Sequence, residues 1–405
     1  MFTGGQGGWG MSFSYVESEQ QAIIKVVGVG GAGGNAVNNM IDSNLQGVIF
    51  IAANTDLQAL GSSRAQIKLQ LGEELTKGLG AGANAQVGRE AALENTEAIR
   101  NALAGSNMVF ITAGFGGGTG TGAAPVIADI CKEMDILTVA VVTKPFSFEG
   151  KKRSRCADEG IECLRQVADT VITIPNDRLR GLASKNAKLI DMFKKADEIL
   201  LNSVKGITDL IFMPGYVNLD FADVRNTMSK SGMALMGIGI ASGENRAIEA
   251  AERAIQHPLL EDMSISGAKA VLMNITSTRE ITLDEMTEAS DRIHKEVGDD
   301  AEIIWGQIFD DTLGDEMRVT VIATGIGSGV EMIPGRRKLT ALRGRLRDIT
   351  PSDIENVIDY EEPAFIRKQV KVDDASVPEV DCGFKLNAQD EYDLDVPTFL
   401  RRKAD

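Results

Sequence analysis

The stretch that decides the fold is Gly114-Phe115-Gly116-Gly117-Gly118-Thr119-Gly120-Thr121-Gly122. It joins a run of apolar residues to an apparent helix, and six of its nine residues are glycine. A structural turn needs only one or two glycines, because few of its residues take a positive φ. The alternating Thr and Gly at its end allow hydroxyls and bare amides to face one concavity, which suits an anion. The stretch therefore predicts a phosphate-binding loop between a strand and a helix.

A second glycine-rich loop, residues 28–35, ends the apolar run at 23–29 and opens another helix. It contains G-x-G-x-x-G, whose glycines let a phosphate approach the backbone while the helix N-terminus supplies N–H donors. Alone, this motif predicts either a Rossmann dinucleotide site or a structural tight turn. A third glycine patch, residues 78–84, either lies over a terminal phosphate or is a flexible loop.

Strands and helices alternate along the first half of the chain. The expected strands are residues 23–29, 47–53, 108–113, 137–143 and 170–174, and the expected helices are residues 35–41, 91–103 and 122–134. Because the strands are continuously apolar, they indicate a parallel α/β sheet that is covered on both faces. The fold class is therefore α/β, with an N-terminal Rossmann-like domain.

The pattern changes after a long central helix expected at 186–206. The strands expected beyond it are residues 269–276, 301–309 and 318–323. A helix at 283–297 separates two of them and opens with a capping box, in which Thr282 is followed three residues later by Glu285. These elements predict a second, smaller C-terminal α/β domain.

The chain divides into six expected segments. They are a disordered leader (1–21), a nucleotide-binding domain (22–185), a central helix with the loop after it (186–223), a C-terminal α/β domain (224–329), a flexible linker (330–390) and a short tail (391–405). The leader is rich in glycine, while the linker is acidic and has no hydrophobic pattern, which is typical of disorder.

Composition excludes several classes of protein. The net charge is −16, so long-range repulsion opposes binding to nucleic acid or anionic lipid. The four cysteines form no CxxC pair and the two histidines are far apart, so we expect no metal held by protein ligands alone. The sequence contains no signal peptide and no apolar run of about 20 residues, which predicts a soluble cytoplasmic protein.

Residues 116–122, GGGTGTG, resemble the signature of the tubulin/FtsZ superfamily, and no Walker A lysine motif occurs. Further motifs resemble the bacterial FtsZ family within it. They are GVGGAGGNAV (28–37), NTD (54–56), KGLGAGAN (77–84), TKPFSFEGKKR (143–153), IPND (174–177), NLDFADV (218–224) and DVPTFLRR (395–402). The resemblance covers residues 22–327 and resumes at the tail.

The resemblance implies a self-polymerising GTPase that forms the bacterial division ring at mid-cell. GTP is then the substrate, hydrolysed to GDP and phosphate in a reaction that assembly stimulates. We expect Mg²⁺ to be held mainly through the phosphates and water, as this hard cation prefers. Ala85, Phe115 and residues 211–216 depart from the family pattern, which leaves the turnover rate and the strength of subunit contacts open.

The resemblance also implies which residues contact the nucleotide. They are Gly31, Ala32, Gly33, Gly34, Asn35, Asn54, Gly118, Thr119, Gly120, Glu149, Arg153, Asn176, Phe193 and Asp197. Glu149 is expected at the ribose, with Arg153 on the same helix face, although the two also fit a surface ion pair. Asn35 and Asp197 are expected to recognise guanine, and Phe193 to stack on the base. A carboxylate accepts from both N1–H and N2–H₂ of guanine; without the resemblance, Asp197 would be interpreted as a solvated charge.

The residues expected to support hydrolysis are Asn218, Asp220 and Asp223. Asp220 and Asp223 are three residues apart and share one face if a helix begins near Asp220, with Leu219 and Phe221 toward the core. Such a pair can position a water, or it is only an acidic first turn that the helix dipole favours. The resemblance implies that this segment is a synergy loop, whose acids act on the GTP of the next subunit, so that a monomer carries half of each site.

The tail at 395–402 resembles a docking peptide of the same family. Val396, Phe399 and Leu400 are expected to anchor in a groove of membrane-tethering and regulatory division proteins, while Arg401, Arg402 and Lys403 add charge steering. The chain would then reach the membrane only through these partners. A frayed, unbound terminus is the alternative explanation.

Two other functions remain open from the residues. An NAD-dependent oxidoreductase would use only the first glycine loop. This hypothesis leaves the second loop, residues 114–122, unexplained, and the sequence offers no convincing catalytic histidine. A tubulin-like scaffold that binds GTP without turnover is opposed by the presence of Asp220 and Asp223.

Overall fold

The computed structural model describes residues 22–179, 188–213, 215–217, 219–230, 232–260, 265–298 and 300–326. All of these belong to one compact unit, Met1–Pro334. The leader at 1–21, Asn218, the linker and the tail therefore lie outside the described residues, and the predictions made for them stay predictions. No helix in the described part of the chain combines the length and apolarity that crossing a bilayer requires.

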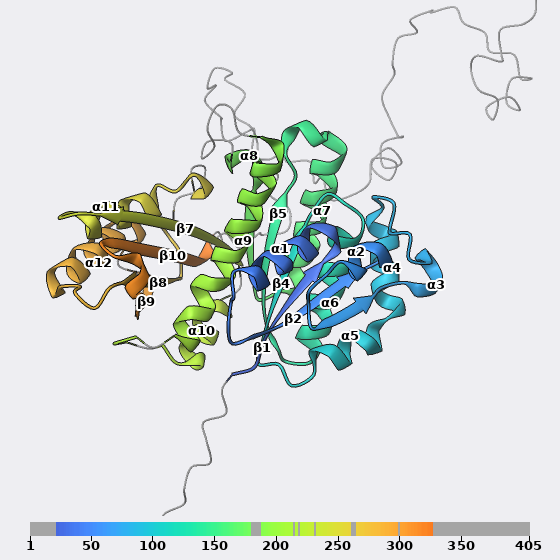
Figure 1. Ribbon diagram of the computed structural model, residues 1–405, viewed down its shortest axis with the longest axis horizontal. Helices are drawn as coiled ribbons and strands as arrows, with labels where there is room; N and C mark the ends of the chain where they lie inside the picture. The colour runs from blue at the N-terminus through green and yellow to red at the C-terminus, as the bar shows by residue number, and fades with distance from the viewer. Residues whose placement is uncertain are drawn as a thin grey trace, which may run out of the picture. The chain divides into compact units, whose positions relative to one another are not determined.

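Ten strands form a single sheet in the order β3-β2-β1-β4-β5-β6-β7-β10-β8-β9 (Figure 1). The N-terminal strands are β1 (Ile24–Val29), β2 (Val48–Asn54), β3 (Ile67–Gln70), β4 (Met108–Gly114), β5 (Leu137–Lys144) and β6 (Thr170–Pro175). These six strands pair in parallel throughout. Every residue of β1 is buried, as expected for a parallel strand that is covered on both faces. The predicted α/β fold class is confirmed.

The sheet continues into the C-terminal part of the chain. Its strands are β7 (Gly232–Ser242), β8 (Ala270–Ser277), β9 (Glu302–Phe309) and β10 (Glu316–Ile326). β7 pairs in parallel with β6, while β10 lies antiparallel between β7 and β8. The sequence did not predict β3 or β7, so the join between the two halves of the sheet is a new finding. The residues at which the predicted domains begin and end remain predictions.

Twelve helices lie in the described part of the chain. They are α1 (Gly30–Asp42), α2 (Leu57–Gly61), α3 (Glu73–Thr76), α4 (Ala85–Glu94), α5 (Thr96–Leu103), α6 (Thr119–Glu133), α7 (Lys151–Val167), α8 (Asn176–Leu179), α9 (Leu189–Phe212), α10 (Phe221–Met228), α11 (Arg246–Ile255) and α12 (Leu283–Val297). The bounds predicted for α12 are confirmed. Its capping box is also confirmed, since Thr282 Oγ1 accepts from Glu285 N at 3.2 Å and Glu285 Oε2 accepts from Thr282 N at 2.8 Å.

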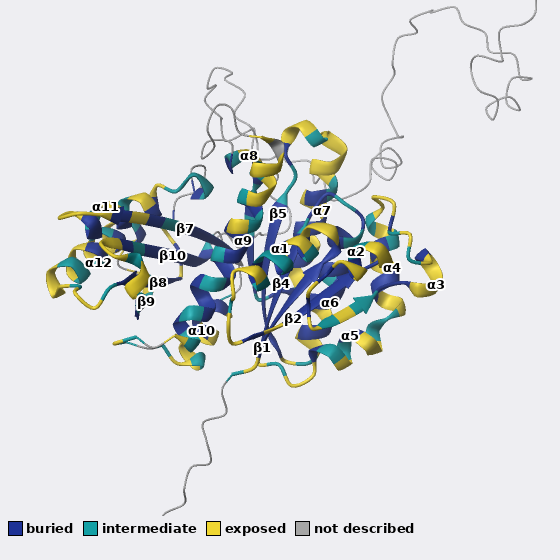
Figure 2. Cartoon of the chain, viewed as in Figure 1, coloured by how far each residue is buried: buried dark blue, intermediate teal, exposed yellow. Residues whose placement is uncertain are grey.

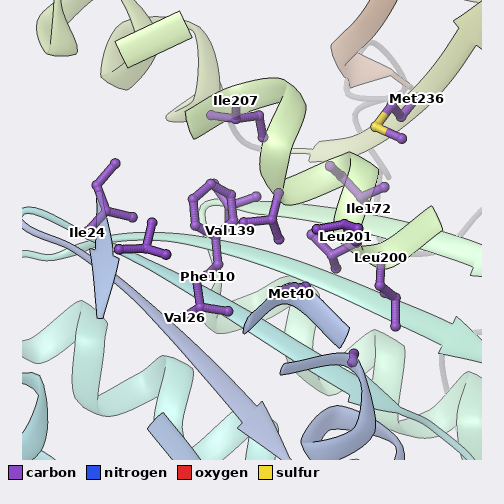
Figure 3. Close-up of a cluster of buried hydrophobic side chains, with 14 of the residues drawn as sticks. Ile24, Val26, Met40, Phe110, Val139, Ile172, Leu200, Leu201, Ile207 and Met236 are labelled. Carbon is purple, nitrogen blue, oxygen red and sulfur yellow. The ribbon is translucent and has the colours of Figure 1, made fainter. Parts of the chain in front are cut away.

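Two hydrophobic layers cover the N-terminal sheet, and burial is deepest in the strands between them (Figure 2). Helices α1, α9 and α10 pack on one face, while α4, α5, α6 and α7 pack on the other. Helix α9 joins the two halves of the molecule, because its Leu200, Leu201 and Ile207 belong to the same cluster as Met236 of β7 (Figure 3). A third cluster packs α11 and α12 against the C-terminal strands.

Several predicted helix bounds were wrong. The helix expected at 35–41 begins at Gly30, and the helix expected at 122–134 begins at Thr119. Glycine is unfavourable in helix interiors, so the sequence pattern predicted that the glycines at the start of α1 and α6 belong to loops. In the structure they form the first helical turn, where the backbone N–H groups have no partner within the helix. The helix expected at 91–103 is two helices, α4 and α5, which meet at Asn95.

Candidate nucleotide-binding site

A pocket of about 350 Å³ opens at the carboxyl ends of β1, β4 and β5. It is lined by Val29, Gly30, Gly31, Ala32, Gly114, Phe115, Gly117, Gly118, Thr119, Gly120, Thr143, Pro145, Glu149, Arg153, Asn176, Phe193, Ala196, Asp197 and Leu200. β1 and β4 are neighbours, but α1 covers one face of the sheet and α6 covers the other. The pocket therefore lies at the switch point where α/β sheets bind their ligands.

The two glycine loops meet at this pocket, as the sequence predicted. Helix α1 begins at Gly30 and helix α6 begins at Thr119, so both helix N-termini border the same space. A Cβ on Gly120 would lie 2.5 Å from the carbonyl oxygen of Gly114, so only glycine fits that close approach. Two sets of unpaired N–H groups thus face one concavity, which is the arrangement that binds phosphate.

The two threonines of the second loop do not share one role, contrary to the expectation that both hydroxyls face the concavity. Thr119 lines the pocket, and its hydroxyl lies 2.7 Å from that of Thr55. Thr121 is buried, and its hydroxyl accepts a hydrogen bond from Gly116 N at 2.9 Å. The Thr121 hydroxyl therefore fixes the shape of the loop from within the fold.

The third glycine patch is held against the second loop. Gly80 N donates to the Thr55 carbonyl at 3.2 Å, and Leu57 N donates to the Gly78 carbonyl at 3.0 Å. A Cβ on Gly118 would lie 2.8 Å from Ala81 Cβ, so the two loops are in close contact. These contacts argue against the interpretation as a flexible loop. Its contact with a terminal phosphate stays a prediction.

Glu149 and Arg153 both line the pocket and form an ion pair. The expectation that they share one helix face was wrong, because Glu149 ends a short 3₁₀ turn and Gly150 separates that turn from α7. The other carboxylate oxygen of Glu149 accepts from Phe146 N at 2.9 Å. The Glu149 side chain is therefore held in place by groups on both sides of it.

The wall opposite the glycine loops comes from α9. Phe193, Ala196, Asp197 and Leu200 recur every three or four residues, so they share one helix face toward the pocket. Burial raises the pKa of the Asp197 carboxyl to about 6, because the charged form loses solvation there. A partly buried acceptor beside an aromatic ring suits a heterocyclic base that carries N–H donors.

Asn176 gives the clearest sign that a ligand belongs here. It lines the pocket at the start of α8 and is only 6% exposed. Its Oδ1 has no hydrogen-bond partner among the described residues. Leaving a buried acceptor unpaired costs about 1–3 kcal/mol, so a ligand donor is expected to satisfy it.

Four predicted contact residues do not line the pocket: Gly33, Gly34, Asn35 and Asn54. A Cβ on Gly33 would lie 2.4 Å from the Thr112 carbonyl, so this glycine lets α1 pack closely on β4. Asn35 is exposed, while the buried Asn54 accepts from Asp56 N at 3.2 Å. Contact of these four residues with a nucleotide therefore stays a prediction.

Sequence reasoning missed several lining residues, among them Thr143, Pro145, Ala196 and Leu200. Thr143 and Pro145 lie at the end of β5, next to the second glycine loop in the sheet. Their position after a buried parallel strand is a signal that could have identified them. Ala196 and Leu200 could have been found from their helical spacing to Phe193 and Asp197.

The two predicted acids lie elsewhere, at the start of α10. Asp220 is the N-cap of this helix, and its Oδ1 accepts from Asp223 N at 2.8 Å. Both residues are exposed, while Leu219 and Phe221 pack partly buried against the core, as expected. Neither acid lines the pocket.

The fold and the pocket are those of an α/β protein in which two helix N-termini border one ligand pocket. Two family models match it: the GTPase domain of the tubulin/FtsZ family over residues 23–184 and the C-terminal domain of the FtsZ family over residues 232–327. The cell division protein FtsZ of Pseudomonas putida is 49% identical over 396 residues, which cover 95% of this chain and 98% of that protein. The chain therefore belongs to the FtsZ family of cell-division proteins.

Solved structures agree with this assignment. An empty FtsZ dimer from M. jannaschii has a TM-score of 0.73 and 44% identity, covering 77% of this chain and 90% of that chain. A GTPγS-bound protofilament of CetZ2 from Haloferax volcanii has a TM-score of 0.65 at 22% identity, covering 75% and 93% of the two chains, and it supports the fold alone. The oxidoreductase hypothesis is wrong, since both halves of the chain match the tubulin/FtsZ family.

Proposed function

We propose that this protein hydrolyses GTP to GDP and phosphate while it polymerises head-to-tail into filaments of the bacterial division ring at mid-cell. Each active site would combine the pocket of one subunit with the synergy loop, residues 218–223, of the next. The observation that carries the proposal is the separation of the pocket from Asp220 and Asp223 within one chain.

Helix α9 gives the scale of that separation. Asp197 of the pocket and Phe212 at the end of α9 are fifteen residues apart, which is about 22 Å along a helix that rises 1.5 Å per residue. The acids follow beyond Phe212, and α8 and α10 lie toward opposite ends of α9 (Figure 1). A carboxylate at this distance cannot position a water for a nucleotide in its own chain's pocket.

The carboxylates that do line the pocket are poorly suited to activate water. Glu149 is engaged by Arg153 and by Phe146 N. Asp197 lies on the α9 wall beside Phe193, Ala196 and Leu200. We therefore assign Glu149 to the ribose and Asp197 to the guanine edge, where it accepts from N1–H and N2–H₂. Adenine lacks this pair of donors.

The phosphates would lie against the N-termini of α1 and α6, whose dipoles and N–H groups favour negative charge. In the described part of the chain, no group of three or more His, Cys, Asp or Glu side chains is placed to hold a metal ion. We propose that Mg²⁺ is bound mainly through phosphate and water oxygens, which suits its preference for octahedral oxygen ligands. It would neutralise charge that develops on the phosphates.

The two acids of the neighbouring subunit would have unequal roles. One oxygen of Asp220 is committed to capping α10, whereas no described side chain pairs with the carboxylate of Asp223. We therefore assign the orientation of the attacking water mainly to Asp223, with Asp220 holding the helix start in position. Phosphoryl transfer needs such positioning more than covalent chemistry. Asn218 is proposed to assist, from outside the described residues.

The tail at 395–402 is proposed to bind membrane-tethering and regulatory proteins of the division machinery, so that cytoplasmic filaments reach the membrane indirectly. Deleting residues 394–405 is expected to leave filament formation in solution intact and to abolish binding to such a tether. Failure to polymerise would show that the tail belongs to the folded body.

Two measurements test the shared-site proposal together. The GTPase rate and light scattering are recorded over a range of protein concentrations with Mg²⁺ and GTP. We expect the rate per molecule to rise steeply above one threshold concentration, at which scattering also appears. A rate per molecule that is constant from high dilution upward would contradict the proposal.

A further inference from the structure

Phe146 does not line the pocket, but it contacts two residues that do, Phe193 and Glu149. It follows β5 and is only 1% exposed. Its ring stacks on Phe148, with centroids 5.1 Å apart and planes at 14°, and meets the edge of Phe193 on α9 at 5.5 Å and 87°. These are the two favoured geometries for aromatic pairs.

The backbone N–H groups of the same segment hold two carboxylates, those of Glu149 and Asp177. Phe146 N donates to Glu149 Oε1 at 2.9 Å, and Ser147 N donates to the Asp177 carboxylate at 3.0 and 3.1 Å. The Phe146 ring thus contacts Phe193, while its N–H contacts Glu149. A substitution that removes only the ring breaks the first link and keeps the second.

Phe193 needs such support because burial alone does not fix it. It is 42% exposed, and it lies one helical turn before Asp197 on the wall of the pocket. A half-exposed side chain keeps rotamer freedom, which a bound base would have to remove at an entropic cost. The edge contact with a fully buried ring restricts that freedom before any ligand arrives.

We infer that Phe146 is a positioning residue for base recognition, since its buried ring holds Phe193 in the orientation that faces the base. Because Phe146 does not line the pocket, its ring would not contact the nucleotide itself. The inference rests on the proposed function, because it takes the α9 wall to be the guanine side of a GTP site. It adds that base affinity and phosphate affinity depend on different parts of the pocket.

The test compares a ligand that has a base with one that has none. Dissociation constants for GTP and for inorganic tripolyphosphate are measured with the full chain carrying Phe146→Leu. We expect GTP binding to weaken about three- to ten-fold, the range for losing a favourable aromatic pair, while tripolyphosphate binding changes less than two-fold. Equal weakening of both ligands, or unchanged GTP binding, would overturn the inference.

A double-mutant cycle separates positioning from general support of the fold. If the Phe146 ring acts through Phe193, Phe146→Leu should have little further effect on GTP binding once Phe193→Leu is present. Fully additive losses would contradict the inference. Phe148→Leu is the matched control, because it removes the other stacked ring, which is 61% exposed, and it should change GTP affinity less than two-fold.

Folding is checked by thermal melting of each variant. If Phe146→Leu does not fold, Phe146→Met replaces it, because Met fills irregular apolar space without a ring. Wild-type protein that binds GTP no better than ATP would overturn the proposed function, and this inference with it. Wild-type protein that prefers GTP, with a Phe146 variant that keeps that preference and affinity, would overturn the inference alone.

Discussion

The pocket and the start of α10 are built in opposite ways. The residues that line the pocket range from buried to exposed, contact one another and include a buried acceptor, Asn176 Oδ1, that no described residue satisfies. Asp220 and Asp223 are exposed on the first turn of a helix. The carboxylates in the lining of the pocket are Glu149 and Asp197, neither of which lies on a glycine loop, whereas Asp220 and Asp223 lie outside that lining.

Each region also exposes a large hydrophobic side chain to solvent. Leu79 in the third glycine patch is 86% exposed, and Tyr216 shortly before the acids is 84% exposed. Single exposed apolar residues are common and carry no conclusion alone. Here they lie beside the two halves of a proposed shared site, where a neighbouring subunit would cover them. The comparison supports the proposal that the two regions are complementary halves of a site shared between subunits.

The largest effect should come from the acid end. Asp223→Ala is expected to lower GTP turnover about 10²- to 10⁴-fold, the range for removing a positioned acid or base, with GTP affinity changed less than two-fold. Phosphate release and nucleotide binding measure the two quantities. Glu97→Ala is the control, because Glu97 is also an exposed acid in the first turn of a helix, α5. Loss of GTP binding in Asp223→Ala would place this acid in the pocket and break the comparison.

At the pocket end, Asp197→Ala should reduce discrimination between GTP and ATP about 10- to 100-fold, since hydrogen bonds to a charged group are worth roughly 1.5–3 kcal/mol. Competition binding of the two nucleotides measures the ratio. Glu198→Ala, the next residue on α9 and not a lining residue of this pocket, should leave the ratio unchanged. Undiminished discrimination in Asp197→Ala would remove it from the base site.

The pH dependence of GTP binding sharpens the same assignment. Burial raises the pKa of Asp197 to about 6, so lowering the pH from 7.5 to 5 protonates the acceptor and removes its charge. GTP affinity should therefore fall about tenfold over this interval, because at one unit below its pKa only about a tenth of a carboxyl is ionised. Asp197→Asn should bind GTP less tightly at pH 7.5 and lose most of this dependence. An affinity that is flat with pH in the wild type would show that the ionised form is not needed.

The smallest effect is expected from Tyr216. Tyr216→Ser should raise the threshold concentration for assembly about two- to five-fold, because less apolar surface is buried between subunits. Sedimentation of polymers at a series of protein concentrations measures the threshold. Leu93→Ala, an exposed apolar residue on α4, is the comparison variant and should change it little. An equal shift in both variants would remove Tyr216 from the interface.

The sequence predicted the features that depend on local chemistry. The two glycine loops followed from residue spacing, and α12 followed from its capping box. It did not predict β7, because glycines such as Gly239 weaken a strand pattern. In the structure, a Cβ on Gly239 would lie 1.9 Å from the Ala250 carbonyl, so the glycine makes room for α11. That reason comes from tertiary packing and cannot be read from the strand itself.

The same limit applies to the site. The unpaired Oδ1 of Asn176 and the ring contact between Phe146 and Phe193 depend on segments that meet only in the folded chain. The ion pair between Glu149 and Arg153, which the sequence offered as an alternative to nucleotide contact, is present, but the shared helix face was wrong because Gly150 interrupts the helix. The family resemblance pointed to Asn176, Phe193, Glu149 and Arg153 but not to Phe146, and only packing revealed how these groups are held.

The central claim is that the pocket of one subunit uses the acid of the next. Its most direct test mixes Asp223→Ala, whose pocket is intact, in equal amounts with Gly120→Ala, whose acid is intact but whose added Cβ would lie 2.5 Å from the Gly114 carbonyl in the phosphate loop. Sedimentation first checks that both variants enter the polymer; about a quarter of the contacts in the mixed filament would then join an intact pocket to an intact acid. The account predicts that the mixture regains GTP turnover, up to about a quarter of the wild-type rate per subunit, and a mixture as inactive as its two components would contradict it.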